Sequence, residues 1–147
     1  MTTLAQQIIR GELPPPPIAQ LNGIVLVEAE PGRAVMRFEV TERHANPSGA
    51  LAGGALCDLV DLAMGVAYAE ALGDITSVVT VELKINFLRP VRRGTLTAEA
   101  RLLNAGRTLG LLDCDVTDER GRLIAHATST YMTLSQASSE SPGNGRT

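Results

Sequence analysis

The segment that most constrains the fold is the Ala- and Leu-rich run GGALCDLVDLAMGVAYAEALG, which begins at Gly53. It contains almost no β-branched residues and ends at Gly73, a favourable residue just past a helix end, so it predicts one long helix. Apolar residues fall on every face of this helix, whereas a surface helix shows a narrower apolar stripe opposite its charged positions. We therefore expect the rest of the chain to wrap around this helix.

Segments on both sides of the helix show the period-two alternation that is typical of strands. Residues 24–29 and 33–40 predict a hairpin around the Pro31-Gly32 turn, with one face buried. In the long run 79–87 the apolar residues alternate with polar ones such as Thr80. Three later alternations carry the apolar sets Leu96, Ala98, Ala100 and Leu102, then Leu112, Cys114 and Val116, then Leu123, Ala125, Ala127 and Tyr131. Because the connections are short, successive strands are expected to pair antiparallel. The prediction is an α+β fold in which a curved antiparallel sheet of five to six strands wraps around one long central helix.

The two ends of the chain differ from this central pattern. Residues 2–11 can form a short amphipathic helix, which the run Pro14 to Pro17 must stop because proline cannot continue a helix. The tail 135–147 is rich in Ser and Gly and has too few apolar residues to offset the entropy of ordering. We expect an N-terminal helix and Pro-rich linker over 1–19, a single domain over 20–134 and a disordered tail over 135–147.

Composition and charge exclude several classes of function. The net charge of −3 and the pI near 5.4 argue against a broad basic surface for nucleic acid. The N-terminus lacks a basic stretch leading into an apolar core, and the longest apolar stretches are interrupted by Asp, so neither export nor membrane spanning is indicated. Cys57 and Cys114 show neither CxxC spacing nor a partner His, which supports neither a metal site nor a disulfide. Reduced thiols and a cytoplasmic location are expected.

Two acids, Asp58 and Asp61, lie in the apolar helix three residues apart, on adjoining parts of its surface. Aspartate is a poor residue for a helix interior and is costly to bury without a partner. One interpretation is structural: the acids face solvent or satisfy backbone groups of a neighbouring segment. The other is functional: a partly buried carboxylate acts as nucleophile or general base.

A Gly-Gly pair, Gly53 and Gly54, stands at the start of the same helix, after the loop residues HANPSGALA. The first N–H groups of a helix have no partner within the helix, and glycine leaves them accessible, so this end can hold a developing oxyanion. A Gly-Gly pair before a helix more often reflects close packing or a permissive turn. By itself the pair decides nothing.

Taken together, these segments resemble the hotdog-fold acyl-CoA thioesterases related to the phenylacetate-pathway enzyme, the PaaI-like family, over roughly residues 20–134. The family's spacing of Asn, Gly, His-Gly-Gly and catalytic Asp is matched by Asn46, Gly49, Ala52-Gly53-Gly54 and Asp61. The segments VELKINFLRPVRRG and GRTLGLLDCDVTDERGRLIAHATSTYMTL resemble the family's central strand and closing hairpin. One departure is that Ala52 stands where the family has His.

The resemblance implies a role for each matching residue. Asp61 would attack the thioester carbonyl or activate the water that attacks it, and Asn46 would orient the carbonyl or the water. The amides of Gly53 and Gly54 would bind the oxyanion. Thr80 matches a Ser or Thr that positions the water, although a solvent-facing strand threonine is an equally simple explanation.

The resemblance also implies the substrate and the assembly. The basic residues Arg89, Arg92 and Arg93 would meet the phosphates of coenzyme A, although each one singly is also explained as part of a solvated turn. The expected activity is hydrolysis of an acyl-CoA thioester to free acid and coenzyme A, with no metal and no other cofactor. The family builds its site between two subunits, which implies a dimer or a dimer of dimers, that is, a homotetramer.

Two other functions stay open. Ala52 favours a noncatalytic acyl-CoA-binding hotdog protein, whereas the presence of the other family residues speaks against it. A hotdog hydratase or dehydratase would need an Asp/His pair at the helix start, and Ala52 leaves no His there. The acyl group is also open, since aryl, short-chain and medium-chain thioesters are all compatible with the pattern.

Overall fold

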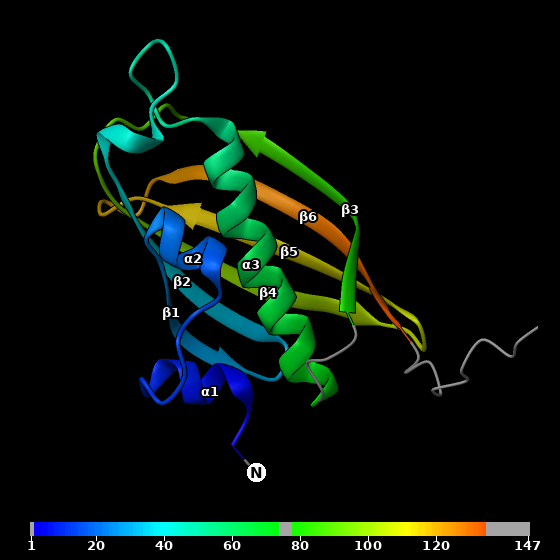
Figure 1. Ribbon diagram of the computed structural model, residues 1–147. Helices are drawn as coiled ribbons and strands as arrows, with labels where there is room; N and C mark the ends of the chain where they lie inside the picture. The colour runs from blue at the N-terminus through cyan, green and yellow to red at the C-terminus, as the bar shows by residue number, and fades with distance from the viewer. Residues whose placement is uncertain (1, 74–77, 135–147) are drawn as a thin grey trace, which may run out of the picture.

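The computed structural model describes residues 2–73 and 78–134, and within them one six-stranded antiparallel sheet curves around a long helix (Figure 1). The predicted tail 135–147 lies outside the described residues. The helices are α1 (Leu4–Ile9), α2 (Pro17–Asn22) and α3 (Gly53–Leu72), with a 3₁₀ turn at Glu42–His44. The strands are β1 (Ile24–Glu30), β2 (Arg33–Val40), β3 (Val78–Phe87), β4 (Gly94–Ala105), β5 (Leu109–Thr117) and β6 (Leu123–Thr133). This architecture confirms the predicted α+β hotdog fold.

Helix α3 packs against all six strands, as its apolar sequence predicted. Its buried residues are Leu56, Leu59, Val60, Ala63, Met64, Ala67, Tyr68, Ala69 and Glu70. The helix ends where Gly73 adopts a left-handed conformation with φ 71° and donates from its N–H to the carbonyls of Ala69 and Glu70. Glycine adopts this conformation without a steric penalty, which explains the position of the helix end.

The strand order is β1-β2-β4-β5-β6-β3, and all pairs are antiparallel. The prediction that each strand pairs with the next is wrong for β3 and β4, because β3 pairs with β6 and β4 lies between β2 and β5. The connection 88–93 crosses this gap. Six extended residues reach about 20 Å, whereas three strand spacings amount to only about 14 Å. The crossover leaves β3 at one edge of the sheet.

Strand β3 contains an irregularity that reverses its alternation. Its register against β6 shifts between Thr80 and Glu82, so Val81 is an extra residue. The predicted single apolar face from residue 79 to 87 is therefore wrong at its start: Val79 is 38% and Val81 is 55% exposed. Thr80, which sequence alternation placed with the outward residues, pairs with the buried Tyr131 and shares its side of the sheet.

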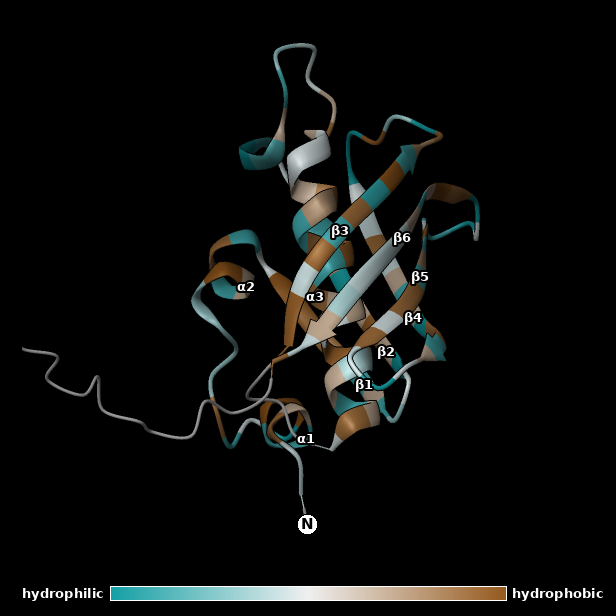
Figure 2. Ribbon diagram, turned by 90° about the vertical axis from the view of Figure 1, so that its right-hand side faces the viewer, coloured by the Kyte–Doolittle hydropathy of each residue, from teal (hydrophilic) through white to brown (hydrophobic). Residues whose placement is uncertain are grey.

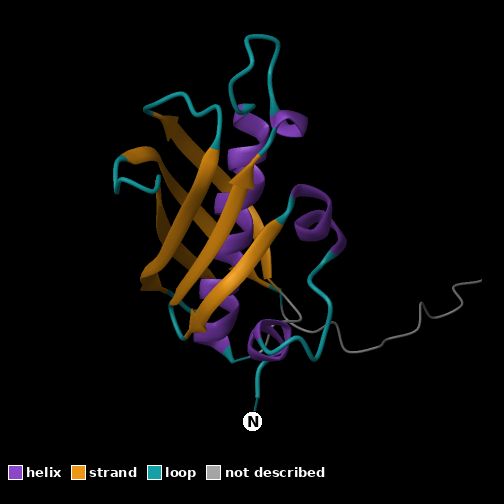
Figure 3. Ribbon diagram, turned by 90° about the vertical axis from the view of Figure 1, so that its left-hand side faces the viewer, coloured by secondary structure: helices purple, strands orange, loops and turns teal. Residues whose placement is uncertain are grey.

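The N-terminal segment packs on one flank of the helix and sheet, next to β1 (Figure 3). Helix α1 is shorter than the predicted 2–11 and begins at a capping box formed by Thr3. Helix α2 was not predicted; it starts at Pro17, a position where the missing N–H of proline is harmless. Ala5 of α1 and Ala19 of α2 are both buried in the same core as α3.

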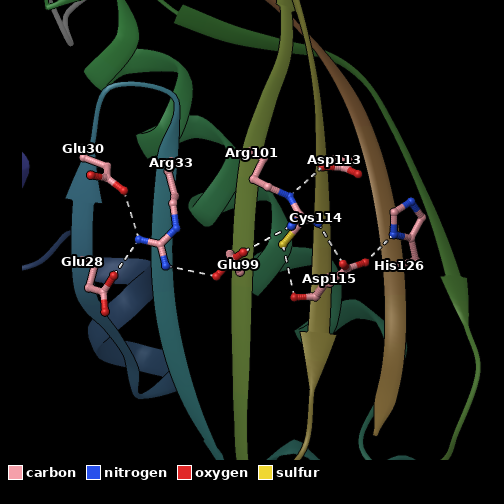
Figure 4. A network of polar contacts seen from close by, with 9 residues as sticks. All are labelled: Glu28, Glu30, Arg33, Glu99, Arg101, Asp113, Cys114, Asp115 and His126. Atoms are coloured by element: carbon pink, nitrogen blue, oxygen red, sulfur yellow. Dashed lines mark hydrogen bonds and ion pairs between the residues drawn. The ribbon is translucent and has the colours of Figure 1, made fainter. Parts of the chain in front are cut away.

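The sheet face turned away from α3 carries a row of ion pairs (Figure 4). Arg33 pairs with Glu28, Glu30 and Glu99, and Arg101 pairs with Glu99, Asp113 and Asp115. At the end of the row, Nδ1 of His126 lies 2.7 Å from Oδ1 of Asp115. These contacts join five strands and involve polar residues that alternate with the core in the sequence. Figure 2 shows the same alternation as bands of opposite hydropathy along the strands.

Candidate active site

The Asp61 carboxylate lies on α3 and is held by two hydroxyl groups from neighbouring strands. Thr80 of β3 donates from Oγ1 to Oδ1 of Asp61 at 2.8 Å. Tyr131 of β6 donates to the same Oδ1 at 2.6 Å, and its hydroxyl also lies 2.6 Å from the backbone carbonyl oxygen of Asp61. With Oδ1 fixed by two donors, the carboxylate has one orientation, and Oδ2 is the oxygen that remains for a substrate or a water. We call these three residues the Asp61 cluster.

Tyr131 is a site residue that the sequence analysis treated only as part of the core. Burial raises the pKa of its hydroxyl well above the usual range, and the adjacent Asp61 carboxylate raises it further. The hydroxyl therefore stays a proton donor at every working pH. The available signal was chemical: a tyrosine at a buried strand position needs a hydrogen-bond partner, and the chain has only two tyrosines.

The Asp61 cluster forms the polar end of an apolar cavity of about 610 Å³. Among the described residues that line it, Asp61, Thr80 and Tyr131 are the ones with polar side-chain groups, and the others are apolar. One wall belongs to α3, and the opposite wall belongs to residues of α1, the proline run and α2. A carboxylate with a fixed orientation therefore faces a space that is suited to an apolar group.

Asp58, the second acid of the helix, has a different environment. Its Oδ2 accepts a hydrogen bond of 2.8 Å from Nδ2 of Asn22, at the end of α2. His44 supports the same contact, because its Nε2 lies 3.0 Å from the backbone carbonyl of Asn22. Asp58 does not line the cavity. Its contacts support the structural interpretation for Asp58, whereas those of Asp61 support the functional one.

The predicted residues at the start of α3 form a second group, lining a smaller cavity of about 240 Å³. Asn46, Gly53 and Arg89 line it together with apolar residues. Oδ1 of Asn46 accepts hydrogen bonds from the backbone N–H groups of Ser48 and Ala50 and from the Ser48 hydroxyl. These bonds fix the loop and leave the Nδ2 donor of Asn46 as the part of its side chain that can reach a substrate.

The first amides of α3 have no partner among the described residues. Ala52 is the N-cap residue and makes no side-chain cap, and no hydrogen bond of the Gly53 or Gly54 N–H is found in the described part of the chain. Gly53 also packs closely: a Cβ at this position would lie 2.9 Å from the Phe87 ring. A larger residue at position 53 would have to displace the Phe87 ring, while Gly54 is open to solvent. We call Asn46, Gly53, Gly54 and Arg89 the helix-start cluster.

The three predicted arginines point to different places. Arg92 donates from Nη1 to the carbonyl of Ser48 at 3.0 Å and so braces the loop. Arg93 is exposed and lies 4.0 Å from the Glu42 carboxylate, a contact worth little in water. Of the three, Arg89 alone lines a cavity with other predicted site residues.

The two clusters lie too far apart along α3 to act on one carbonyl within one chain. Gly54 and Asp61 are seven positions apart, which corresponds to about 10 Å along a helix axis. A reacting carbonyl must lie about 3 Å from both the attacking group and the oxyanion donors.

The described residues contain no group of His, Cys, Asp or Glu suited to a metal ion, and no helix long and apolar enough to cross a membrane.

Comparisons with known proteins agree with this geometry. A family model described as thioesterase superfamily matches residues 48–125. Human acyl-coenzyme A thioesterase 13 is 33% identical over 116 residues, covering 75% of this chain and 79% of that protein. The 1,4-dihydroxy-2-naphthoyl-CoA hydrolase of Listeria monocytogenes is 31% identical over 102 residues, covering 69% and 83% of the two chains.

A solved structure gives the same result at the level of the fold. The PaaI protein from the phenylacetic acid degradation operon of Escherichia coli superimposes with a TM-score of 0.79 at 25% identity, covering 89% of this chain and 94% of that one. The resemblance inferred from the motifs is thereby confirmed. The chain belongs to the thioesterase superfamily, with the hotdog fold of the PaaI-like thioesterases, and this membership supports thioester hydrolysis as its general chemistry.

Proposed function

We propose that this protein hydrolyses an acyl-CoA thioester to a free acid and coenzyme A, with Asp61 as the catalytic residue. The observation that carries this proposal is the Asp61 carboxylate, held by two hydroxyls at the polar end of an apolar cavity. The cavity offers a place for an acyl group, and the free Oδ2 offers a base or nucleophile beside its carbonyl carbon. The names of two relatives, a CoA hydrolase and an acyl-coenzyme A thioesterase, support the choice of substrate.

Two routes fit this arrangement. Oδ2 of Asp61 can accept a proton from a water that attacks the carbonyl carbon, or it can attack that carbon itself and form a mixed anhydride. In both routes the C–S bond breaks, the thiolate leaves and takes up a proton, and water supplies the oxygen of the acid. No atom changes oxidation state, so the proposed reaction requires no redox cofactor. Thr80 and Tyr131 orient the carboxylate in either route.

The oxyanion is expected to form at the helix-start cluster of a second copy of the chain. Within one chain the amides of Gly53 and Gly54 are too far from Asp61, so a complete site needs these donors from a partner. The position of β3 at an edge of the sheet supports this assembly, because in the described part of the chain no strand pairs with its outer side, and Val79 and Val81 are exposed. We propose a dimer as the smallest active unit, and a dimer of dimers as a compatible larger assembly.

Arg89 is the proposed contact for a phosphate of coenzyme A. It lies beside Asn46 and Gly53, where the thioester end of the substrate would meet the amides. Arg92 and Arg93 are proposed to contribute only positive charge near the phosphates, because Arg92 braces the loop and Arg93 lies near Glu42.

A thiol-release assay on a panel of aliphatic and aryl CoA thioesters tests the proposal. We expect thiol release by the wild-type chain that Asp61→Asn abolishes, while an oxygen ester of the same acid reacts slowly. The rival function, binding without hydrolysis, is favoured by Ala52 in place of the family's His. Saturable binding of an acyl-CoA with no thiol release from any thioester would support that rival and contradict the proposal.

A further inference from the structure

The cavity next to Asp61 is walled on one side by the N-terminal segment. Leu4, Ile8, Leu13 and the prolines that follow line it, as does Ala19 of α2. The facing wall comes from α3, where Leu62, Gly65, Val66 and Ala69 recur at helical spacing beside Asp61. The segment before β1 therefore encloses space that the sheet and α3 leave open.

The position of this wall is fixed by specific contacts. Ala5 is 3% and Ala19 is 1% exposed, so both short helices are anchored in the core. The end of α2 is held through Asn22, whose side-chain amide donates to Asp58 and whose backbone carbonyl accepts from Nε2 of His44. Between the helices, consecutive prolines restrict the backbone because each fixes its own φ. A wall held in this way can set the length of a bound group.

The chemistry of the lining selects among acyl groups. The three polar side chains of the cavity stand at one end and already bond to one another. A ring hydroxyl deeper in the cavity would find no side-chain partner among the described lining residues and would be costly to bury. At about 610 Å³ the space suits a ligand larger than an acetyl or benzoyl group, and a small acyl group would leave most of the apolar wall without contacts.

We infer that residues 4–19 form one wall of an acyl-binding cavity, that the substrate's acyl group is an aliphatic chain, and that Ile8 helps to set its length. This inference rests on the proposed function, since it places the acyl group of the same thioester. Each methylene that enters the cavity should raise kcat/KM by about fourfold. The rise should stop when the chain fills the space.

The test measures kcat/KM for straight-chain thioesters from acetyl-CoA to palmitoyl-CoA, together with phenylacetyl-CoA, on three variants. Ile8→Phe narrows the cavity and should lower the ratio of decanoyl to butyryl turnover by about tenfold, the effect of one or two methylenes. Ile8→Ala widens it and should move the best chain length upward. The matched control is Leu21→Ala in α2, which is 71% exposed and does not line the cavity, so its profile should equal that of wild type.

The outcomes separate this inference from the proposed function. Opposite shifts of the profile in the two Ile8 variants would support it, because a folding defect lowers all substrates alike and cannot move the optimum in two directions. Thioester hydrolysis with an unchanged profile, or with acetyl-CoA or phenylacetyl-CoA as the best wild-type substrate, would overturn the inference and leave the proposed function intact. No hydrolysis of any thioester by wild type would overturn both.

Discussion

The Asp61 cluster and the helix-start cluster differ in how far their polar groups are satisfied within one chain. In the Asp61 cluster, Oδ1 has two donors, and the donors come from β3 and β6, far apart in sequence. In the helix-start cluster, the amides of Gly53 and Gly54 have no partner among the described residues. One cluster presents an acceptor and the other presents donors. This difference is consistent with the proposal that the two clusters are complementary halves of one site, which two copies of the chain would complete.

The largest expected effect comes from removing the acceptor. Asp61→Asn keeps the size of the side chain but makes it neither basic nor nucleophilic, so kcat should fall by about a hundredfold or more. Steady-state thiol release on the best substrate measures the loss, and circular dichroism checks the fold. The matched control is Asp58→Asn, which should cost far less because Asp58 bonds to Asn22 and lies outside the cavity. Equal losses from both would indicate a coupled pair of carboxylates instead.

The next effect tests whether the two halves come from different chains. Asp61→Asn and Asn46→Ala should each be nearly inactive alone, but in a mixed dimer one site keeps both wild-type residues. Unfolding and refolding an equal mixture should restore about a quarter of wild-type activity, since half of randomly formed dimers are mixed and each has one intact site. Refolded single variants are the controls. A mixture no more active than its components, or a fully active monomer in sedimentation, would disprove the two-chain site.

Features that depend on residues close in sequence could be predicted, whereas features that depend on contacts distant in sequence could not. Helix α3 and its end at Gly73 depend on local residue preferences, and both were predicted. The inward turn of Thr80 depends on the register shift at Val81, which arises from pairing with β6 some fifty residues later and leaves no local signal. The position of β3 beside β6 has the same origin, since a short connection by itself predicts pairing with β4.

The site shows the same division. The spacing that placed Asn46, Gly53, Gly54 and Asp61 was recognised as a family motif, but Tyr131 was not, because its position has the same period-two pattern as core residues around it. The three arginines formed one cluster in sequence, whereas the structure separates Arg89, which lines the small cavity, from Arg92, which braces the loop. Residues of one turn are close in sequence, but their side chains can point in different directions.

Tyr131→Phe tests how much the fixed orientation of the carboxylate in the Asp61 cluster contributes to activity. The variant keeps the ring and removes one of the two donors to Oδ1, so the carboxylate loses part of its fixed orientation. We expect kcat to fall by about tenfold to thirtyfold, the equivalent of one hydrogen bond to a charged group, with little change in KM. Thermal unfolding checks the fold of the variant. A lower Tm with an unchanged kcat would indicate a purely structural role for the Tyr131 hydroxyl.

Ala52→Thr tests the helix-start cluster and has the smallest expected effect. Thr at the N-cap position can accept a hydrogen bond from the second or third amide of α3, which Ala52 cannot. The helix should gain about 1 kcal/mol of stability, seen as a rise in Tm of about 2–4 °C. If the Gly54 amide is an oxyanion donor, the new hydroxyl competes with the substrate for it, and kcat/KM should fall by about fivefold to tenfold.

Ala52→Val is the matched control for this substitution, because valine has the shape of threonine but no hydroxyl. Ala52→Val should show neither the gain in stability nor the loss of kcat/KM that depends on the cap. The comparison of the two variants therefore separates the effect of the hydrogen bond from that of side-chain size. A threonine variant that is more stable than the valine variant and equally active would mean that the cap and the reaction use different amides, and the oxyanion role of Gly54 would be wrong. In that case catalysis would not explain why position 52 lacks a capping side chain. A rise in Tm coupled to a fall in kcat/KM would show instead that the uncapped helix start is kept for the substrate.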